Sequence, residues 1–539
     1  MSLLPPGRAG VRKDLLALGF GAAVLFFVSL GARDLWQPNE PTYGQAVAEM
    51  SRSGDWIVPT VNGRVFAEKP VLYYWMALAS AAVLGGVSEL SLRVPAAVSG
   101  VLGVLLTYLL VLPYAGRNRA RLAAAILATT YGVFWNSRAV QMDILVVVST
   151  LAVVLAVVRV ADHGAPPLRG AALAGLAAGL GFLGKGPVSW ICPAIVLVPY
   201  LAATRRLALL RSRAAAAGAA VCLAVAVPWF LALLARGDLA FLREMLFRQN
   251  VTRFVAAWDH QAPPWYYLWN FWIDMMPWGW FVPLAALLPG RDREERRLDL
   301  LAWISIGATV LFFSLSESKR SVYILPVAPA VAVLVAGVGS RLADGTLPRA
   351  RRIAALALLA VGGALAAAGG AAVLFRLVPR YPEAASEAKA LGWLLVAGGA
   401  AILVAFASPA RVRTAAPAAL LALVLSLELL AAVVLLPAAN RYKSARAFCE
   451  QVSARVAPAE PIASYRFWTW RASYSFYTRR AIRNLESPDE LASFAAARSS
   501  SFVIVEDDGL AEAERVLGRR EPLVKADIGG TTAYLLSCR

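Results

Sequence analysis

The sequence predicts a polytopic α-helical membrane protein that carries a small α/β domain at its carboxyl end. Of its 539 residues, 59% are hydrophobic and only 16% are charged, and the mean hydropathy is +0.61. A soluble protein carries roughly 25% charged residues and has no core that hides so much apolar surface. Lipid must therefore cover a large part of this chain.

Thirteen apolar segments are long enough to cross a hydrocarbon core about 30 Å thick. They lie near residues 15–32, 94–113, 121–137, 144–160, 170–184, 188–203, 214–235, 265–289, 299–315, 321–339, 353–377, 389–407 and 416–437. The first segment follows Arg8, Arg12 and Lys13 and has no clear signal-peptidase site. We interpret it as a membrane helix with the amino terminus inside.

A fourteenth apolar stretch, at 71–87, is broken by Tyr, Trp, Ser and paired Gly residues. If it crossed the membrane, the basic cluster at 117–121 and the clusters after it would all lie outside. As an interfacial or re-entrant segment it leaves them inside, where Lys and Arg concentrate. We therefore expect an odd number of spans, with the carboxyl-terminal tail outside.

Five polar stretches are predicted on the same outer side as the tail. They are 33–70, 138–143, 185–187, 236–264 and 316–320. We divide the chain into a membrane domain at 1–440, with a large first outer loop at 33–93, and a tail domain at 441–539.

The tail predicts a small α/β domain that packs on the outer loops and performs no chemistry of its own. Ser487 and Glu490 have the spacing of a helix capping box. Strands are expected at 502–506 and 532–537, with a helix near 509–518 between them.

The four cysteines lack metal-ligand spacing. Cys192 and Cys222 lie in apolar spans, whereas Cys449 and Cys538 lie in the tail. A disulfide between the two tail cysteines stays open.

Two nucleotide-binding patterns overlap at 179–187, GLGFLGKGP, but neither has its required setting. Gly186 stands where a Walker motif needs Ser or Thr, and the preceding residues form a small-residue apolar helix rather than a strand. The net charge of +19 comes from short basic clusters between spans, which are topology signals. We therefore expect no nucleotide and no nucleic-acid partner.

Ionisable side chains gather in the outer stretches, at a depth where they are costly and tend to mark sites. The first loop offers Asn39 and Glu40 at a helix start, and Glu68 and Lys69 before an aromatic run. Asn39 and Glu40 also fit a simple turn with a helix cap. Residues 42–51 could equally form an amphipathic helix on the membrane.

The later outer stretches add Arg138, Asp143, Lys185, Arg253, His260, Tyr267, Lys319 and Arg320. Arg138 has the alternative of snorkelling to headgroups, and Tyr267 that of an interfacial aromatic belt. A lone histidine is usually structural, but His260 near Glu68 would suit a divalent metal ion. Lys319 and Arg320 run against the inside rule for basic residues, so we expect an anion to meet them.

Together these residues predict a cavity that opens outward and binds a lipid phosphate. Several cations that converge below a membrane surface suit a phosphate group. Carboxylates beside them suit proton transfer or the binding of sugar hydroxyls.

The motifs run, in chain order, Asn39-Glu40, Glu68-Lys69-Pro70, Arg138 to Asp143, Lys185-Gly186-Pro187, Arg253, His260 to Tyr267, Ser318-Lys319 and Tyr323-Ile324-Leu325-Pro326. This order resembles the bacterial dolichyl-phosphate-mannose-protein mannosyltransferase-like family. Within it, the chain looks most like the 4-amino-4-deoxy-L-arabinose transferases that modify lipid A. The resemblance covers essentially the whole chain.

The resemblance implies a C-type glycosyltransferase fold in the bacterial inner membrane and a sugar donor carried on polyprenyl phosphate. Transfer to lipid A, or to a related lipid or glycan, would occur at the periplasmic face. No cofactor would be required, and a divalent metal ion at Glu68 and His260 stays open.

The resemblance also implies roles for single residues. Lys69, Arg138 and Lys319 would contact the donor phosphate. Asp143 and Glu40 would orient the acceptor or bind the sugar, and Asn39 would contact the sugar. The remaining expected substrate contacts are Lys185, Arg253, Tyr267, Arg320 and Tyr323.

One position departs from the family pattern, because the family's first loop typically reads Asp-Glu and this chain has Asn39. An asparagine can hydrogen-bond a sugar but cannot take a proton or carry charge. If the acceptor is a hydroxyl, Glu40 or Asp143 would have to act as base. If the acceptor is a phosphate oxygen, which is already ionised, little base is needed.

Two alternatives stay open. A protein O-mannosyltransferase-like enzyme would use a peptide acceptor. A lipid-linked-sugar transporter or an inactive binding homologue would bind the donor without forming a bond, and Asn39 is its main support. Transporters often carry internal repeats, and none is visible here.

Overall fold

The computed structural model describes residues 8–286, 288–409, 411–467, 471–497 and 500–538. The chain divides into two compact units. The membrane unit comprises Met1–Val28, Glu68–Leu72 and Pro95–Val434, and the α/β unit comprises Ser29–Ala67, Tyr73–Val94 and Leu435–Arg539. Most of the first outer loop therefore belongs to the same unit as the tail.

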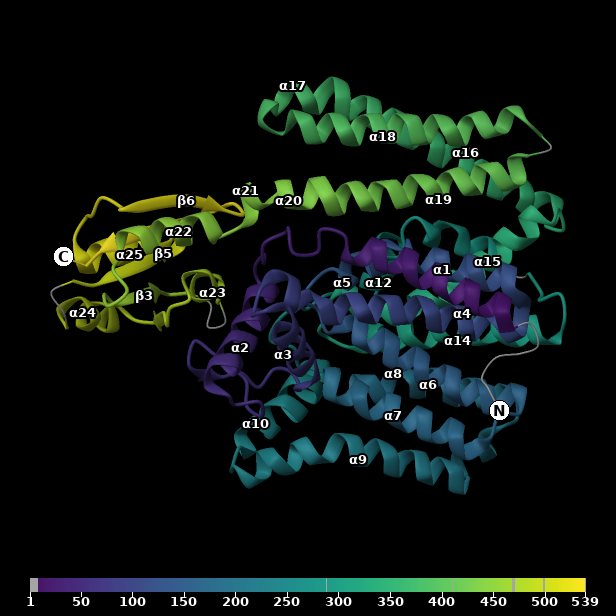
Figure 1. The fold of residues 1–539 in the computed structure, drawn as a ribbon, viewed down its shortest axis with the longest axis horizontal. Helices are drawn as coiled ribbons and strands as arrows, with labels where there is room; N and C mark the ends of the chain where they lie inside the picture. Colours follow the sequence, from purple (N-terminus) through teal and green to yellow (C-terminus); the bar gives the residue numbers. More distant parts are fainter. Residues whose placement is uncertain (1–7, 287, 410, 468–470, 498–499, 539) are drawn as a thin grey trace. The chain divides into compact units, whose positions relative to one another are not determined.

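The membrane unit is built from long apolar helices that run side by side (Figure 1). Its principal helices are α1 (Arg8–Phe27), α4 (Glu89–Ala128), α6 (Asp143–His163), α7 (Pro167–Lys185), α8 (Val188–Ala203), α9 (Arg213–Ala235), α14 (Arg293–Leu315), α15 (Ala328–Ala343), α16 (Arg349–Ala372), α18 (Ala385–Val404) and α19 (Val412–Leu430). Among the described residues, nine helices are long and apolar enough to cross a membrane. The predicted polytopic helical fold is confirmed.

The predicted span at 121–137 is not one helix. Helix α4 continues from the preceding span into this one, with a non-helical backbone at Gly116 (φ 73°). It ends at Ala128, and a short helix, α5 (Tyr131–Ser137), follows. Glycine accepts the positive φ at Gly116 without steric cost, so the chain can change direction there.

The predicted span at 265–289 is also broken. Helix α12 (Tyr266–Asp274) ends three residues before Pro277, a 3-10 turn covers Trp278–Phe281, and α13 (Val282–Ala285) follows. Proline lacks the backbone N–H that a helix interior needs. A count of apolar residues does not register that loss.

Small residues allow helices α7 and α9 to pack closely. A Cβ atom added at Gly175 of α7 would lie 2.0 Å from the carbonyl oxygen of Gly218 in α9. A Cβ atom added at Gly218 would lie 2.6 Å from the carbonyl oxygen of Ala171. The two backbones are therefore in direct contact, as small residues permit in membranes.

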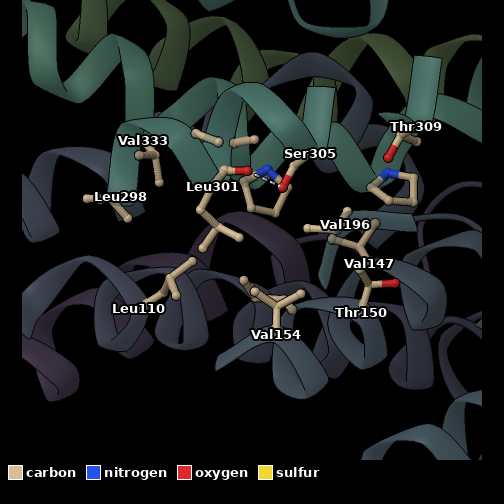
Figure 2. Close-up of a pocket in the computed structure, with 15 residues that line it drawn as sticks. Leu110, Val147, Thr150, Val154, Val196, Leu298, Leu301, Ser305, Thr309 and Val333 are labelled. Atoms are coloured by element: carbon tan, nitrogen blue, oxygen red, sulfur yellow. Dashed lines mark hydrogen bonds between the residues drawn. The ribbon is translucent and has the colours of Figure 1, made fainter. Parts of the chain in front are cut away.

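The interior of the membrane unit also holds a small apolar pocket, which Figure 2 shows. Its volume is about 30 Å³, and it lies between residues of α4, α6, α8, α14 and α15. Ser305 donates its hydroxyl to the carbonyl of Leu301 at 2.7 Å. The described residues that line this pocket carry no ionisable side chain, so it offers no group for catalysis.

The α/β unit is centred on a five-stranded sheet with strand order β4-β3-β5-β7-β6. The strands are β3 (Ile462–Tyr465), β4 (Arg483–Leu485), β5 (Phe502–Glu506), β6 (Val524–Ile528) and β7 (Thr531–Ser537), and the tail helices are α22 (Arg446–Arg455), α23 (Ser473–Thr478), α24 (Pro488–Ala496) and α25 (Asp507–Leu517). Strand β3 pairs in parallel with β4 and β5, whereas β7 pairs antiparallel with β5 and β6. The predicted α/β tail is confirmed.

The sheet has a hydrophobic core on each face, since successive strand residues point to opposite sides. Ile504 belongs to one core, and Val503 and Val505 belong to the other. Cys449 lies in the first core and Cys538 in the second, and both thiols are free. The structure therefore has no disulfide between them.

The first outer loop folds onto the tail within the α/β unit. Its helix α2 (Asn39–Ser53) is preceded by a segment whose backbone and side chains bind tail residues. Asn440 accepts hydrogen bonds from the indole of Trp36 at 3.1 Å and from the backbone N–H of Asp34 at 3.0 Å. The hydroxyl of Tyr477 accepts one from the N–H of Leu35 at 2.7 Å. The expected packing of the tail on an outer loop is thus confirmed for the first loop.

We predict that Gly175→Ala lowers the stability of the protein by about 1–3 kcal/mol, because the new methyl group forces α7 and α9 apart. The measurement is the thermal unfolding midpoint of the purified protein in detergent. Gly307→Ala in α14 is the matched control, since a Cβ atom there meets nothing within 4 Å. Equal midpoints for the two variants would contradict the close packing.

Candidate functional site

One cavity in the membrane unit combines positive charge with an apolar lining. We call it the basic cavity, and its volume is about 400 Å³. Its polar lining consists of Glu68, Lys69, Lys185, Gln249, Asn250, Arg253, Ser316, Ser318 and Tyr323. Its apolar lining includes Val188, Ile191, Met245, Leu246, Phe254, Phe312 and Phe313. The predicted convergence of Lys69, Lys185 and Arg253 from distant parts of the chain is present.

Lys69 is the half-buried centre of this positive charge. Withdrawal of its ammonium from water, together with the charges of Lys185, Arg253 and Arg320, lowers its pKa to about 8. Glu68 opposes them. The repulsion that these cations exert on the Lys69 ammonium favours the binding of an anion beside it.

Lys185 is the last residue of α7 and pairs with Asp143, the first residue of α6. The carboxylate of Asp143 is buried, and its place in the first turn of a helix suits a negative charge. The ammonium of Lys185 also lies 5.4 Å from the ring centre of Tyr323. This ion pair fixes Lys185 at the cavity wall.

The glycines of the 179–187 stretch lie inside helix α7 up to Gly184. Their backbone N–H groups are used within the helix, so they cannot cradle a phosphate as a P-loop does. The structure thus removes the basis of a nucleotide site at this motif.

Arg253 lies in a short helix, α11 (Arg253–Val255). Its guanidinium pairs with Asp259 at 2.7 Å and contacts the Ser318 hydroxyl at 3.4 Å and the Gln249 amide oxygen at 3.4 Å. The fork of donors is held at several points, which orients it for an incoming anion.

Segment 316–320 is tied to the loop that precedes α12. Lys319 donates its backbone N–H to the carbonyl of His260 at 2.9 Å, and its buried ammonium donates to the carbonyls of Ala262, at 2.9 Å, and Ser316. Lys319 therefore holds the loop in place. Its expected contact with a phosphate stays a prediction.

Arg138 likewise has backbone partners. Its guanidinium donates to the carbonyls of Leu25 at 2.9 Å, Phe26 at 3.0 Å and Val28 at 2.7 Å. These are carbonyls that the end of α1 leaves unsatisfied. The side chain is buried, and its expected contact with a phosphate also stays a prediction.

Asn39 and Glu40 belong to the α/β unit, as the first two residues of α2. Glu40 is only 5% exposed and is held between two arginines. Arg33 donates to its two carboxylate oxygens at 2.7 and 3.0 Å, and Arg93 at 2.9 and 3.0 Å. A carboxylate so engaged supports the fold of its own unit, and its expected role as a base stays a prediction.

A second cavity, which we call the polar cavity, lies in the same membrane unit and measures about 350 Å³. It is lined by Tyr131, Gly132, Trp135, Asn136, Gln141, His260, Tyr266, Asp274, Lys319, Arg320, Ser321 and Val322. Tyr267 is fully buried and donates its hydroxyl to the carbonyl of Arg320 at 3.2 Å. The expected substrate residue Arg320 thus lines this cavity rather than the basic one.

Asp274 is a candidate that the sequence analysis missed. It is the only Asp, Glu, Lys, Arg or His residue in the predicted span at 265–289. A charge inside a membrane segment is by itself a sign of function. Candidate residues were sought in the predicted outer stretches, and Asp274 lies inside a predicted span.

The metal prediction for Glu68 and His260 gains no support. Glu68 lines the basic cavity, whereas His260 lines the polar one. Among the described residues, no three His, Cys, Asp or Glu side chains gather as metal ligands would. Withdrawal from water and the charge of Arg320 lower the pKa of His260.

The fold and the basic cavity define the class of this protein: it has the membrane fold of the C-type glycosyltransferases. The crystal structure of ArnT from Cupriavidus metallidurans in the apo state matches with a TM-score of 0.79 and 21% identity, over 99% of this chain and 98% of that one. The same protein bound to undecaprenyl phosphate matches with a TM-score of 0.77, over 97% and 98% of the two chains.

Sequence comparison then identifies the family. Residues 68–231 match the family described as dolichyl-phosphate-mannose-protein mannosyltransferase. The chain is 32% identical, over 384 residues, to the undecaprenyl phosphate-alpha-4-amino-4-deoxy-L-arabinose arabinosyl transferase of Pseudomonas paraeruginosa. The aligned residues cover 69% of this chain and 67% of that protein. It is 31% identical to arabinosyl transferase 1 of Pseudomonas fluorescens, over 62% of this chain and 59% of the relative. The chain belongs to this arabinosyl transferase family.

We predict that Glu40→Gln destabilises the protein by about 3–5 kcal/mol, because it leaves the buried charges of Arg33 and Arg93 uncompensated. The measurement is again the unfolding midpoint in detergent. Glu486→Gln is the control, since its pair with Arg64 is exposed and an exposed pair contributes at most about 1 kcal/mol. A midpoint for Glu40→Gln no lower than that of the control would contradict the structural role.

Proposed function

We propose that this protein transfers 4-amino-4-deoxy-L-arabinose from undecaprenyl phosphate to lipid A at the periplasmic face of the inner membrane. The observation that carries the proposal is the basic cavity, where Lys69, Lys185 and Arg253 meet an apolar lining. Membership of the arabinosyl transferase family supports the choice of donor and acceptor.

The cavity suits both parts of a lipid phosphate. The three cations match the phosphate, with arginine as a two-donor fork and the lysines as point charges. Phe254, Phe312 and the other apolar lining residues match the first isoprene units of the carrier. A free sugar nucleotide has no apolar chain that would pack against this surface.

The same cations would act in the chemical step. The bond between the anomeric carbon and the donor phosphate oxygen breaks, the acceptor oxygen forms the new bond, and the electron pair stays on the lipid phosphate. Positive charge held close to the departing phosphate stabilises the charge that develops there. One displacement of this kind inverts the anomeric carbon.

The acceptor oxygen decides how much base is required. A phosphate oxygen of the acceptor is already ionised, so Asn39 in the first loop is compatible with transfer. A hydroxyl acceptor would require a base. Asp143 would then have to break its ion pair with Lys185 before it could accept the proton of that hydroxyl. The phosphate acceptor needs no such exchange, and we favour it.

Label transfer tests this function. Purified protein is incubated with undecaprenyl phosphate that carries radiolabelled 4-amino-4-deoxy-L-arabinose and with lipid A, and the label is followed. Label on lipid A is the expected result. Label on an added peptide would favour a protein-directed enzyme, and donor binding without transfer would favour a binding homologue or transporter.

We predict that Lys69→Ala lowers the transfer rate by about 10²–10³-fold, because it removes the central cation beside the leaving phosphate. The variant should remain folded, with an unchanged elution volume on size exclusion. Lys389→Ala removes an exposed lysine of α18 and should keep the wild-type rate. A wild-type rate for Lys69→Ala would overturn the assignment of the basic cavity.

We also predict that donor binding weakens as the pH rises. The pKa of Lys69 is about 8, so its ammonium is charged below that pH and loses its charge above it. Affinity for undecaprenyl phosphate should fall about tenfold between pH 7 and pH 9, the value of one charge-assisted hydrogen bond. Lys69→Arg stays charged throughout and is the control. Titration of the ligand affects both proteins equally, so it cancels when their affinities are divided at each pH. Parallel pH profiles would contradict the prediction.

A further inference from the structure

The polar cavity contains an acid that the proposed phosphate chemistry does not use. Asp274 is its only carboxylate among the described lining residues. Its oxygen Oδ2 is buried without a hydrogen-bond partner. No described cation of the chain forms an ion pair with it. The carboxylate of Asp274 is therefore available to a ligand that enters the polar cavity.

Two of the three basic residues around the cavity are engaged with backbone carbonyls or mainly uncharged. The ammonium of Lys319 is held by the carbonyls of Ala262 and Ser316. His260 has a lowered pKa, so it is mainly neutral at neutral pH. Arg320 is the third basic residue of the lining. Asp274 is therefore the acidic group that the described lining offers to a positively charged ligand.

The rest of the lining suits a small polyhydroxylated ring. Tyr131, Trp135 and Tyr266 supply aromatic surface, and Asn136 and Gln141 supply amides that can bind hydroxyl groups. Asn136 uses its amide N–H in a bond to the carbonyl of Gly132 at 2.8 Å, which holds the side chain in place. A pocket of about 350 Å³ with a few fixed polar groups is of the size that small ligands occupy.

The polar cavity adjoins the basic one through segment 316–320. Ser318 lines the basic cavity, whereas the next two residues, Lys319 and Arg320, line the polar cavity. The charge of Arg320 acts on Lys69 across this segment. A group attached to a phosphate at Lys69 is therefore close to the polar cavity.

We propose that the polar cavity is a sugar site that selects an amine-bearing sugar through Asp274. The inference rests on the proposed function, and it adds the group that recognises the amino substituent of the donor. An ammonium group forms an ion pair with the carboxylate in addition to its hydrogen bond, whereas the hydroxyl group of a neutral sugar forms the hydrogen bond alone. Asp274 thus makes the enzyme prefer an amino sugar over a neutral sugar of equal size.

The test compares two donors on the same undecaprenyl phosphate carrier. One carries 4-amino-4-deoxy-L-arabinose and the other carries L-arabinose, which has a hydroxyl group in place of the amine. The ratio of kcat/KM for the two donors is measured for the wild type, for Asp274→Asn and for Asp344→Asn. Asp344→Asn is the matched control, because it removes an exposed carboxylate of the membrane unit.

We expect the wild type and Asp344→Asn to prefer the amino donor. In Asp274→Asn, turnover of the amino donor should fall about 10–100-fold while turnover of the neutral donor changes less than about threefold. An unchanged ratio in Asp274→Asn would overturn the inference. A loss of both donors alike would assign Asp274 a structural role and overturn it too.

Two arms keep the inference separate from the proposed function. If the wild type transfers neither sugar, the proposed function fails, and the same ratio is then read from the dissociation constants of the two donors. Undecaprenyl phosphate without sugar should bind equally to the wild type and Asp274→Asn, and a difference would count against the inference. If Asp274→Asn does not fold, Asp274→Ser removes the same charge and replaces it in every arm.

Discussion

Repulsion among cations that share one small cavity is the constraint on which the rest of the membrane unit depends. Lys69, Lys185 and Arg253 come from segments far apart in the sequence, and each would lower its energy by moving away from the others. The structure prevents this by local ties. Asp143 holds Lys185, and Asp259 holds Arg253, while Lys319 keeps the intervening loop in register through backbone carbonyls. The cations are thus held at the cavity before any ligand arrives, and an anion that enters finds its partners already in place.

The basic residues of the outer stretches divide into two kinds. Arg138 and Lys319 are buried and bind carbonyls of the main chain, so they stabilise helix and loop ends. Lys69 and Arg253 remain partly exposed to the cavity. Sequence position does not separate these kinds, because both occur beside apolar segments at the same expected depth. The separation depends on which carbonyls the fold leaves unsatisfied nearby, and only the tertiary structure determines that.

Much of the fold could be predicted because it follows from local properties of the chain. Runs of apolar residues gave the helices of the membrane unit, and alternation and a capping box gave the strand at 502–506 and the start of α24. The break after Asp274 could not be read from mean hydropathy, since the residues on both sides of Pro277 are predominantly apolar. Of the site, the cations of the basic cavity were predicted from their place in outer stretches on one side of the membrane. Glu40 was expected near substrate, but nothing in the sequence indicates that Arg33 and Arg93 enclose it.

Segment 316–320 contributes residues to both the basic cavity and the polar cavity. Ser318 lines the basic cavity, and Lys319 and Arg320 line the polar cavity. A shift of the backbone in this segment would therefore affect the lining of both cavities. On the two proposals made above, variation here during evolution would alter both the binding of the lipid carrier and the selection of the sugar.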